Sequence, residues 1–568
     1  MDIDDTASYV QGDTVGIGSC FNEDGSINVD KYRLYAEQED ALLDLEESEL
    51  QTLYQEEEEA EGNITMSLDD ETRTTTTTAT GRRKRRCKSI KPYYFDDEGN
   101  KIVLQPKQTI WYIMYVVSPT LDCQKFNHKF RRRFRMPYQQ FLRMVDWSED
   151  AQVFQRWRSK DAVGNSSSPL ELMILGALRY LGRGLTFDDL EEYTAINEET
   201  HRQFFHVFIT WGQDWLFPKF VRMPTTAAEY KAHQGEFNVA GLPGAGFSTD
   251  ATNVIMWRCS HNLRQSNMGF KQSTPARTYN LTANHRHRIL YTTRGHPSRW
   301  NDKTLAHFDE FMTGLHDGTI LQDVTFHLFS WEGEVGKSSL EATKYSGAWG
   351  LVDNGYHKWA CTQAPAKFNL LRSEERLSQW IESMRKDVEC TFGILKGRWR
   401  ILKTGIRLDG PEAADKTWLT CCALHNMLLE CDGLDEWNGS VGENDVVEMR
   451  RHAPFAIQRL ADDQLMSFGS RDHEQQCVME EQQRRAVNRQ RGQLQEEEDG
   501  VGEIAQESDD HLSGRAQQLA IDGSVRVNSL TYDDFRNRLV EHFDIQFRRH
   551  RVRWPERQRQ QQQQQSTN

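Results

Sequence analysis

Residues 245–258 read AGFSTDATNVIMWR, and this stretch decides the fold class of the chain. It follows Pro243-Gly244, where the helical spacing of apolar residues gives way to a β-rich pattern. A second β-rich stretch, YNLTANHRHRILYTT at 279–293, has a turn at 284–286. The two stretches predict neighbouring strands, so this part of the chain is expected to contain a sheet.

Strands and helices alternate beyond that point. The sequence predicts an extended segment at 325–331, a short buried strand over 348–356 that ends on Asp353, a long helix from about Ser373 to Arg398, and a helix near 415–430. Strands that alternate with helices indicate an α/β domain. We place this domain at about 240–432.

The region upstream, 106–235, is predicted to be helical. Residues 168–215 contain three short helices joined by tight turns, with Thr186 as the N-cap of the second and Asn197 or Glu198 opening the third. Three such helices have the shape of a helix-turn-helix unit that reads DNA. A small helical bundle that only packs would show the same pattern, so both interpretations stay open.

The net charge of −16 is unevenly distributed along the 568 residues. Residues 1–72 hold 22 of the 85 acidic residues and two of the 69 basic ones, which leaves 63 acidic and 67 basic residues in the remainder. The body is therefore mildly basic and a polyanionic partner is compatible with it. We expect 1–95 to be disordered, and 433–568, which is rich in Glu, Gln and Arg, to be mostly disordered apart from a possible helix at 531–550.

Several classes of protein are disfavoured by the sequence. The longest apolar stretches, such as WYIMYVV at 111–117, fall short of the ~20 residues that a membrane span needs, and the acidic start shows no secretory signal. Ten cysteines without a CxxC pair favour a reducing compartment. The segment GEVGKSS at 333–339 lacks the first glycine of a phosphate loop. His285 and His287 have no cysteine at zinc spacing, so we expect them on a hairpin surface, where contact with DNA is the alternative.

Three acids stand out in the predicted α/β domain. Asp250 and Asp353 each follow a predicted strand, and Glu389 lies on the long helix beside its apolar stripe. Their carboxylates are the hard oxygen donors that Mg²⁺ and Mn²⁺ prefer, and two such ions can activate water and stabilise the leaving oxygen of a phosphodiester. A single acid of this kind is more often structural, so the combination carries the argument. We expect the three carboxylates to converge closely enough to share ions ~4 Å apart.

A fourth acid, Asp302, precedes a predicted helix. It is either an accessory metal ligand or an acid in the first turn of that helix.

Residues 240–430 resemble the Harbinger-type (PIF/Harbinger) DDE transposase family. Five blocks in order carry the resemblance: Gly246–Val254, Gly295–Pro297 with Trp300–Leu305, Leu351–Tyr356, Val388–Trp399 and Ala423–Met427. The helical region upstream is similar to the region that precedes the nuclease domain in this family. Ala251 and Asn253 stand where the family usually has Gly and His. The resemblance implies an RNase H-like nuclease domain, a mixed sheet flanked by helices.

The resemblance also implies a function. It implies a nuclear DNA transposase that uses a divalent cation, Mg²⁺ or Mn²⁺, with Asp250, Asp353 and Glu389 as catalytic metal ligands and Asp302 as a further metal-associated acid. Such an enzyme binds double-stranded DNA at the ends of its element, hydrolyses phosphodiester bonds and uses the freed 3′-hydroxyl for strand transfer. A separate Myb-like DNA-binding partner is typical of the family, and a homo-oligomer is a further expectation.

Two other functions are weighed against this one. One is a domesticated nuclear DNA-binding or scaffold protein without cleavage activity, which the intact acids argue against. The other is a general RNase H-like nuclease acting on other nucleic acids.

Basic residues near these segments are candidates for phosphate contacts. They are Lys396, Arg398 and Arg400 after Glu389, and Arg131, Arg132 and Arg133 in the helical region. For the first three, an exposed basic face without a ligand is the alternative. A separate cluster fits a nuclear localisation signal or a phosphate-contacting arm, the alternative being a solvated charge run: Arg82, Arg83, Lys84, Arg85, Arg86 and Lys88.

Overall fold

The computed structural model describes residues 93–95, 101–103, 105–158, 168–269, 274–332, 339–366, 371–437, 439 and 523–555. All of them belong to one unit, Ser89–Asn568. The predicted acidic tail up to Lys88, with its basic cluster, lies outside the described residues, as does most of the predicted C-terminal tail.

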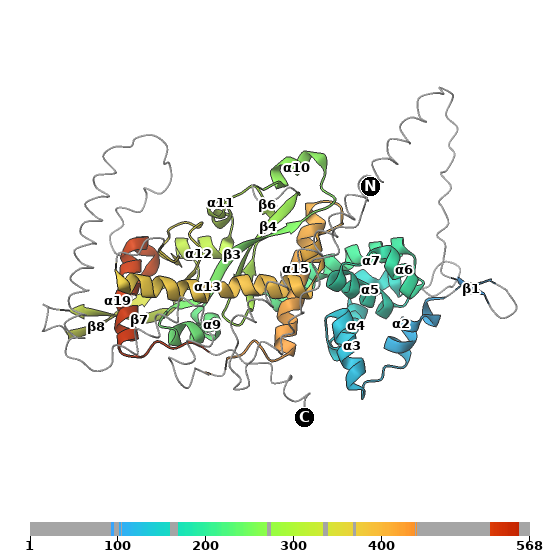
Figure 1. Cartoon of the computed structure of the whole chain (residues 1–568), viewed down its shortest axis with the longest axis horizontal. Coiled ribbons are helices and arrows are strands. Elements are labelled where there is room, and N and C mark those ends of the chain that lie inside the picture. Colours follow the sequence, from blue (N-terminus) through green and yellow to red (C-terminus); the bar gives the residue numbers. More distant parts are fainter. Residues whose placement is uncertain are drawn as a thin grey trace, which may run out of the picture. The chain divides into compact units, whose positions relative to one another are not determined.

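A mixed sheet with the order β10-β9-β3-β4-β5 lies at the centre of the α/β part, and β6 pairs with β4 beside it (Figure 1). β3, β4 and β5 follow one another as antiparallel neighbours, whereas β9 and β10 run parallel to β3 on its other side. The predicted strands in this region are confirmed. Their bounds are β3 Ala245–Ile255, β4 Ala276–Ala283, β5 Ile289–Thr292, β6 His296–Pro297, β9 Trp349–Leu351 and β10 Thr362–Gln363.

Helix α13, Arg372–Arg398, crosses the sheet and contacts β3, β4 and β9 (Figure 1). The predicted helix, from about Ser373 to Arg398, is confirmed, and its apolar stripe is buried because Leu377, Trp380, Ile381, Met384 and Val388 are fully covered. The other helices of this part are α9 Ala227–Val239, α10 His261–Asn267, α11 Asp302–His307, α12 Glu310–Asp317, α14 Ile401–Thr404 and α15 Pro411–Cys431.

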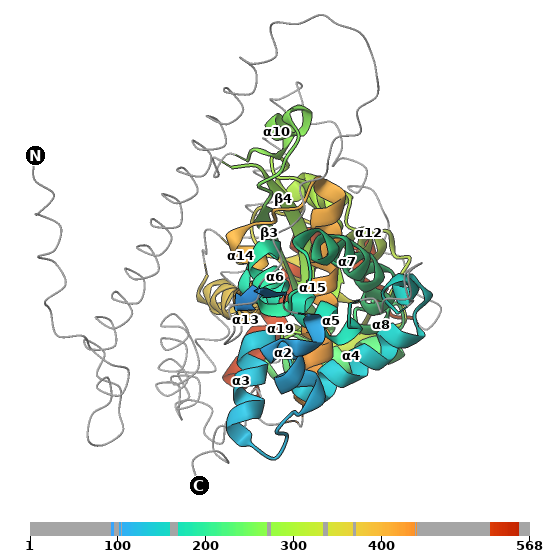
Figure 2. The same cartoon turned by 90° about the vertical axis from the view of Figure 1, so that its right-hand side faces the viewer.

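The region before the sheet is helical, as predicted, and Figure 2 shows its helices toward the viewer. Thr186 caps α6 through a reciprocal capping box with Asp189, and Asn197 caps α7. Its elements are η2 Pro106–Gln108, α2 Ile110–Tyr112, η3 Ile113–Val117, α3 Gln124–Phe134, α4 Tyr138–Asp150, η4 Gln152–Trp157, α5 Leu170–Arg183, α6 Phe187–Thr194, α7 Glu198–Trp211, η5 Gly212–Leu216 and α8 Phe217–Phe220. A short hairpin, β1 Tyr93–Phe95 with β2 Lys101–Val103, precedes them.

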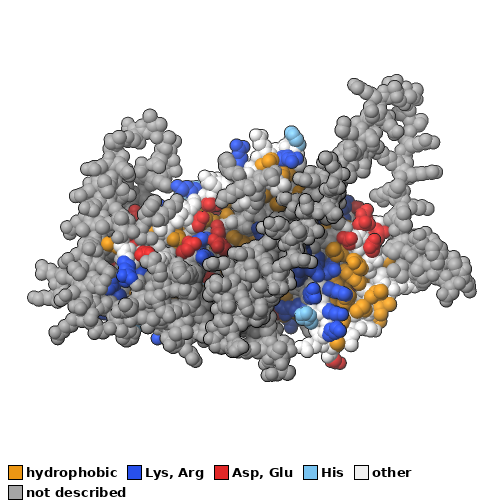
Figure 3. Space-filling view, viewed as in Figure 1, with side chains coloured by type: hydrophobic (Ala, Val, Ile, Leu, Met, Phe, Trp, Pro, Cys, Tyr) orange, Lys and Arg blue, Asp and Glu red, His pale blue; other side chains and the backbone are white. Residues whose placement is uncertain are grey.

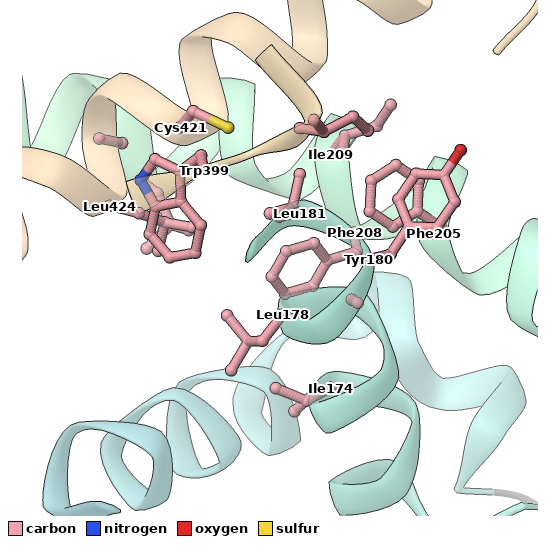
Figure 4. Close-up of a cluster of buried hydrophobic side chains, with 14 of the residues drawn as sticks. Ile174, Leu178, Tyr180, Leu181, Phe205, Phe208, Ile209, Trp399, Cys421 and Leu424 are labelled. Atoms are coloured by element: carbon pink, nitrogen blue, oxygen red, sulfur yellow. The ribbon is translucent and has the colours of Figure 1, made fainter. Parts of the chain in front are cut away.

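One hydrophobic core crosses the predicted boundary between the helical region and the α/β domain. In Figure 4, Leu178 of α5 and Phe208 of α7 lie in the same cluster as Trp399 and Leu424, which follow the sheet in the sequence. Because buried aromatic and leucine side chains each contribute about 1.5–3 kcal/mol, this shared core fixes the helical region on the α/β part.

The C-terminal segment completes the α/β part. Its elements are β11 Val525–Arg526, η6 Val527–Ser529 and α19 Tyr532–Arg548, and β11 joins a second sheet formed by β7 Thr325–Glu332 and β8 Ser339–Ser346. The possible helix at 531–550 is thus confirmed. It is a core element and no part of a disordered tail, because Phe535, Leu539 and Phe543 are buried in the same cluster as the α13 stripe.

The outer edge of β7 is covered by α19. The backbone N–H of Phe329 donates to His542 Nδ1 and that of Trp331 donates to Glu541 Oε1, both at 2.9 Å. A bare strand edge invites pairing with another chain. Here side chains from the C-terminal helix satisfy two of its N–H groups.

Candidate functional site

Asp250 and Asp353 lie near each other, just beyond the point where the parallel pairing of β3 with β9 ends. The parallel pairing of β3 with β9 ends at Ser248 and Leu351, and each aspartate follows two residues later on its own chain. Side chains alternate between the two faces of a sheet along a strand. Asp250 and Asp353 are therefore expected on the same face of the sheet as Ser248 and Leu351. Asp250 was expected at the end of its strand. It lies within β3 instead, because pairing with β4 continues to Ile255 after β9 has diverged.

Backbone N–H groups hold both aspartates. Asp250 Oδ1 accepts from the N–H of Ala251 at 2.8 Å, and Asp353 Oδ1 accepts from the N–H of Gly355 at 2.7 Å. Each bond occupies one carboxylate oxygen, and the second oxygen of Asp250 faces Arg385 Nη1 at 3.5 Å. The bond from Ala251 favours the ionised form of the Asp250 carboxyl group.

Glu389 of α13 lies near Asp250, and Arg385 lies one turn before Glu389 on the same helix. Arg385 Nη1 is 2.8 Å from Glu389 Oε1 and 3.5 Å from Asp250 Oδ2, while Arg385 Nη2 is 3.2 Å from Glu382 Oε1. The guanidinium is buried, whereas the side chain of Glu389 is 46% exposed. Arg385 therefore neutralises acids from both the strand and the helix.

The charges of the acids act on one another. Burial raises the pKa of Asp250 to about 7, the bond from Ala251 and the charge of Arg385 oppose the rise, and the charges of Asp353 and Glu389 add to it. For Arg385, burial would lower the pKa, but Glu382, Glu389 and Asp250 outweigh it and the pKa is raised. Asp250, Asp353, Glu389 and Arg385 thus form one electrostatic cluster.

Asp302, the first residue of α11, lies close to Gly355, and Gly355 also lies close to Asp353. A Cβ at Gly355 would meet Asp302 Oδ2 and would lie 3.0 Å from Asp353 Oδ1. Asn301 provides the N-cap of α11, since its side chain accepts from the N–H of Thr304. Both earlier alternatives for Asp302 are therefore compatible with its place, because it is a first-turn acid that also faces Asp353. Acidic side chains gather near the centre of Figure 3, in the area where Figure 1 places α11 and α12.

The expected convergence on shared ions is not formed as the side chains stand. Among the residues that the structure describes, no group of three or more His, Cys, Asp or Glu side chains is arranged to hold a metal ion. The donor set still fits Mg²⁺ or Mn²⁺, because it consists of carboxylates only. The missing Cβ of Gly355 also leaves room between Asp302 and Asp353.

A buried hydrogen-bond network is coupled to the acidic cluster, and no motif in the sequence indicates it. The hydroxyl of Tyr356 donates to Asn280 Oδ1 at 2.5 Å, and Asn280 Nδ2 donates to Asp309 Oδ2 at 2.6 Å. Burial raises the pKa of Tyr356, and the charges of Asp250, Asp302, Asp309 and Asp353 raise it further. The Tyr356 hydroxyl therefore keeps its proton within reach of the charges of these four aspartates.

The turn between β4 and β5 is attached to α13 close to Glu389. His285 was expected on a hairpin surface, which is wrong: it is 1% exposed and its Nδ1 pairs with Asp387 Oδ2. His287 Nδ1 lies 3.0 Å from Thr391 Oγ1. These contacts flank Glu389 on the helix, so both histidines fix the rotation of α13 that presents Glu389 to the aspartates.

The basic residues after Glu389 do not share one environment. Lys396 Nζ donates to the backbone oxygen of Asn253 at 2.9 Å, and burial lowers its pKa to about 8. Burial also lowers the pKa of Arg398 to about 10, although the charge of Asp432 opposes the shift. The Lys396 side chain therefore attaches the end of α13 to β3, whereas Arg400 follows the helix and lies near Arg135.

Arginines from three segments gather on the helical region. We call this set the arginine patch; it comprises Arg132, Arg133, Arg135, Arg179, Arg183 and Arg400. Burial and then the charges of neighbouring arginines lower the pKa of Arg135 and of Arg179. In Figure 3, Lys and Arg side chains gather in the area where Figure 1 places α3 to α5. Predicted Arg131 is paired with Asp432 at 2.5 Å, whereas Arg132 and Arg133 are exposed.

Sequence reasoning missed Arg135, Arg179 and Arg183. Arg179 and Arg183 are separated by one helical turn on α5, and only the packing of α3 beside it brings them to Arg133 and Arg135.

Within the described part of the chain, none of the helices is long and apolar enough to cross a membrane.

No curated protein and no solved structure matches the chain. One family model does match, and it covers the segment from β3 to α15 that contains all four acids and Arg385. Residues 249–426 are similar to the DDE superfamily endonuclease family.

Proposed function

We propose that the protein is a divalent-metal-dependent DNA endonuclease of the transposase type, with a nuclease domain over about 240–432. The observation that supports this proposal is the electrostatic cluster where the pairing of β3 with β9 ends: Arg385 contacts both Asp250 and Glu389, and the charges of Asp353 and Glu389 act on Asp250. The sheet order β5-β4-β3-β9-β10 supports an RNase H-like fold, because three successive antiparallel strands, β3 to β5, are joined on the other side of β3 by two parallel strands, β9 and β10. The Harbinger-type subfamily remains part of the proposal on the five sequence blocks.

In this proposal Asp250, Asp353 and Glu389 hold Mg²⁺ or Mn²⁺, and Asp302 is an accessory acid. Divalent ions held by carboxylates polarise a phosphodiester and lower the pKa of an attacking water. The N–H groups of Ala251 and Gly355 orient the two aspartates before substrate arrives. The same site would serve hydrolysis and then strand transfer by a freed 3′-hydroxyl.

The arginine patch supports binding of double-stranded DNA. The neighbouring arginines of the patch repel one another. DNA phosphates that bind them would relieve this repulsion and would release the counterions of the DNA. Arg132, Arg133 and Arg400 are the predicted phosphate contacts that lie in this patch. Nuclear import through the cluster from Arg82 to Lys88, a Myb-like partner and a homo-oligomer complete the proposal on the sequence resemblance.

A second candidate function is a domesticated, non-cleaving DNA-binding or scaffold protein. The observation that favours it is the position of Arg385, whose guanidinium contacts Asp250 and Glu389 where a cation would be held. In a protein that no longer binds metal, the ion pairs of Arg385 with Asp250 and Glu389 would not interfere with function. The intact carboxylates favour the nuclease.

Cleavage of DNA separates the two candidates. The assay measures nicking of a duplex that carries the element ends, with Mg²⁺ or EDTA, for the full chain, Asp353→Asn and the control Asp146→Asn, an exposed acid on α4. We expect Mg²⁺-dependent nicking that Asp353→Asn abolishes and Asp146→Asn retains, with equal thermal melting temperatures. Equal nicking by Asp353→Asn would remove the metal-site assignment. DNA binding without nicking would support the scaffold, and nicking of RNA or unrelated duplexes at the same rate would indicate a general nuclease.

A further inference from the structure

Three aromatic rings form a cluster near Asp302 in the sequence, two of them half-buried and one exposed. We call it the aromatic ledge; it comprises His296, Trp300 and Phe308. The ring centroids of His296 and Trp300 are 5.0 Å apart with nearly parallel planes, and those of Trp300 and Phe308 are 4.8 Å apart. The side chain of Phe308 is 56% exposed. A large aromatic ring held by two others and open to solvent offers a flat face to a ligand.

The ledge is fixed to the sheet and to α11. His296 lies in β6, which pairs with β4, and the N–H of Trp300 donates to the backbone oxygen of Pro297 at 3.0 Å. The N–H of Phe308 donates to the oxygen of Leu305 at 3.0 Å and closes the end of α11. Rigid rings of this kind stack on a partner at little cost in side-chain entropy.

The surroundings of the ledge are suited to a nucleotide. Arg299 lies next to Trp300 in the sequence, Lys303 lies next to Asp302, and both side chains are exposed. The His296 ring is neutral, because burial and the charge of Arg277 lower its pKa although Asp415 opposes the shift. An uncharged stacked face with basic side chains at its border matches a nucleobase with its phosphates better than it matches an acidic or an aliphatic partner.

The ledge lies close to the acids along the chain. Trp300 precedes Asp302 by two residues, and Phe308 is the C-cap of α11, the helix that begins at Asp302. We propose that the aromatic ledge stacks an unpaired base of the DNA strand whose phosphate lies at the acids. This inference rests on the proposed function and names how its substrate strand is held.

Stacking on bases is separable from contact with phosphates by an abasic oligonucleotide. The experiment measures fluorescence anisotropy of a labelled 16-nucleotide oligo-dT and of an abasic strand of equal length, with EDTA present to prevent cleavage. One stacked base is worth ~1–3 kcal/mol, so the full chain should bind oligo-dT about tenfold more tightly than the abasic strand. Trp300→Ala and Phe308→Ala should reduce this preference below about twofold, while Phe308→Tyr should retain it. Affinity for the abasic strand should stay the same in all variants.

Tyr193→Ala is the matched control, since Tyr193 is 45% exposed and stacks on Trp111 in the helical region. It should keep the full preference for oligo-dT. Equal binding of both strands by the full chain, an unchanged preference in Phe308→Ala, or the same loss in Tyr193→Ala would overturn the ledge as a base-stacking site. Intact nicking with an unchanged preference in Phe308→Ala would refute the ledge alone. A preference that Phe308→Ala abolishes, without Mg²⁺-dependent nicking, would support the ledge and refute the proposed nuclease.

Discussion

Arg385 Nη1 lies 3.5 Å from Asp250 Oδ2 and 2.8 Å from Glu389 Oε1, so a guanidinium joins the strand acid to the helix acid. Four carboxylates in one region repel one another, and Arg385 offsets part of that repulsion. A metal ion that binds Asp250 and Glu389 must compete with this internal cation. We therefore expect this residue to stabilise the metal-free site and to weaken the metal affinity that we propose for it.

Arg385→Gln should bind Mn²⁺ more tightly than the parent chain. We expect a change of about fivefold, because an ion pair worth ~1 kcal/mol no longer competes. The metal-free variant should melt at a lower temperature, since the acids lose their counterion. Isothermal titration calorimetry and thermal melts measure the two effects, and Lys386→Gln, an exposed neighbour, should change neither. Weaker Mn²⁺ binding by Arg385→Gln would mean that the guanidinium supports the loaded site.

Gly355→Ala should damage the metal site without unfolding the chain. A Cβ there would meet Asp302 Oδ2 and Asp353 Oδ1, so at least one carboxylate must move. We expect a loss of Mn²⁺ affinity of tenfold or more, about 1.4 kcal/mol, while the free energy of unfolding changes little. Gly393→Ala is the matched control on α13: its Cβ would meet nothing within 4 Å, and it should stabilise the helix by ~0.5–1 kcal/mol. Similar Mn²⁺ affinities of the two variants would contradict this account of Asp302.

The arginine patch should determine how DNA binding depends on salt. Each phosphate contact contributes about −0.9 to the slope of log K against log salt concentration. Arg132→Gln and Arg183→Gln should each make the slope shallower by about that amount and weaken binding to all duplex sequences alike. Arg202→Gln is the control, because that arginine is exposed on α7 and paired with Glu199. An unchanged slope in the first two variants would place the DNA elsewhere.

The sequence predicts those features of the fold that depend on local pattern. The α13 helix was bounded to within one residue because its apolar stripe is continuous, and the strand that carries Asp250 was found from its β-rich composition. The burial of His285 was missed because it depends on Asp387, 102 residues away. The Tyr356–Asn280–Asp309 network joins three separate segments, so no spacing in the sequence reveals it.

For α19, the sequence predicts the helix but not where the helix packs. Its amphipathic pattern predicted a helix, but only the fold shows that this helix covers β7 and fills the core beside α13. Phe543→Ala should therefore destabilise the chain by ~3–5 kcal/mol, the usual cost of removing a buried phenylalanine. Urea unfolding measures this, with exposed Arg538→Ala on the same helix as the control. A change below about 1 kcal/mol in Phe543→Ala would show that α19 is dispensable.

Acid should destabilise the helical region through His201. Burial lowers the pKa of this imidazole to about 3, and its Nε2 lies 2.7 Å from Thr194 Oγ1. The folded-state pKa is below the unfolded value of ~6.5. The unfolded chain therefore binds the proton more readily, so the stability from this group is complete above ~6.5 and is lost as the pH falls toward about 3.

His201→Gln keeps a polar group beside Thr194 and removes the titration. Its free energy of unfolding should fall less steeply between pH 7 and pH 5 than that of the parent chain, by at most ~1.4 kcal/mol per pH unit for one proton. Urea unfolding at each pH measures the two curves. His128→Gln, at an exposed position on α3, should run parallel to the parent chain. If the His201→Gln curve also ran parallel, His201 would have to be protonated in the folded chain, which its 2% exposure and its contact with Thr194 oppose.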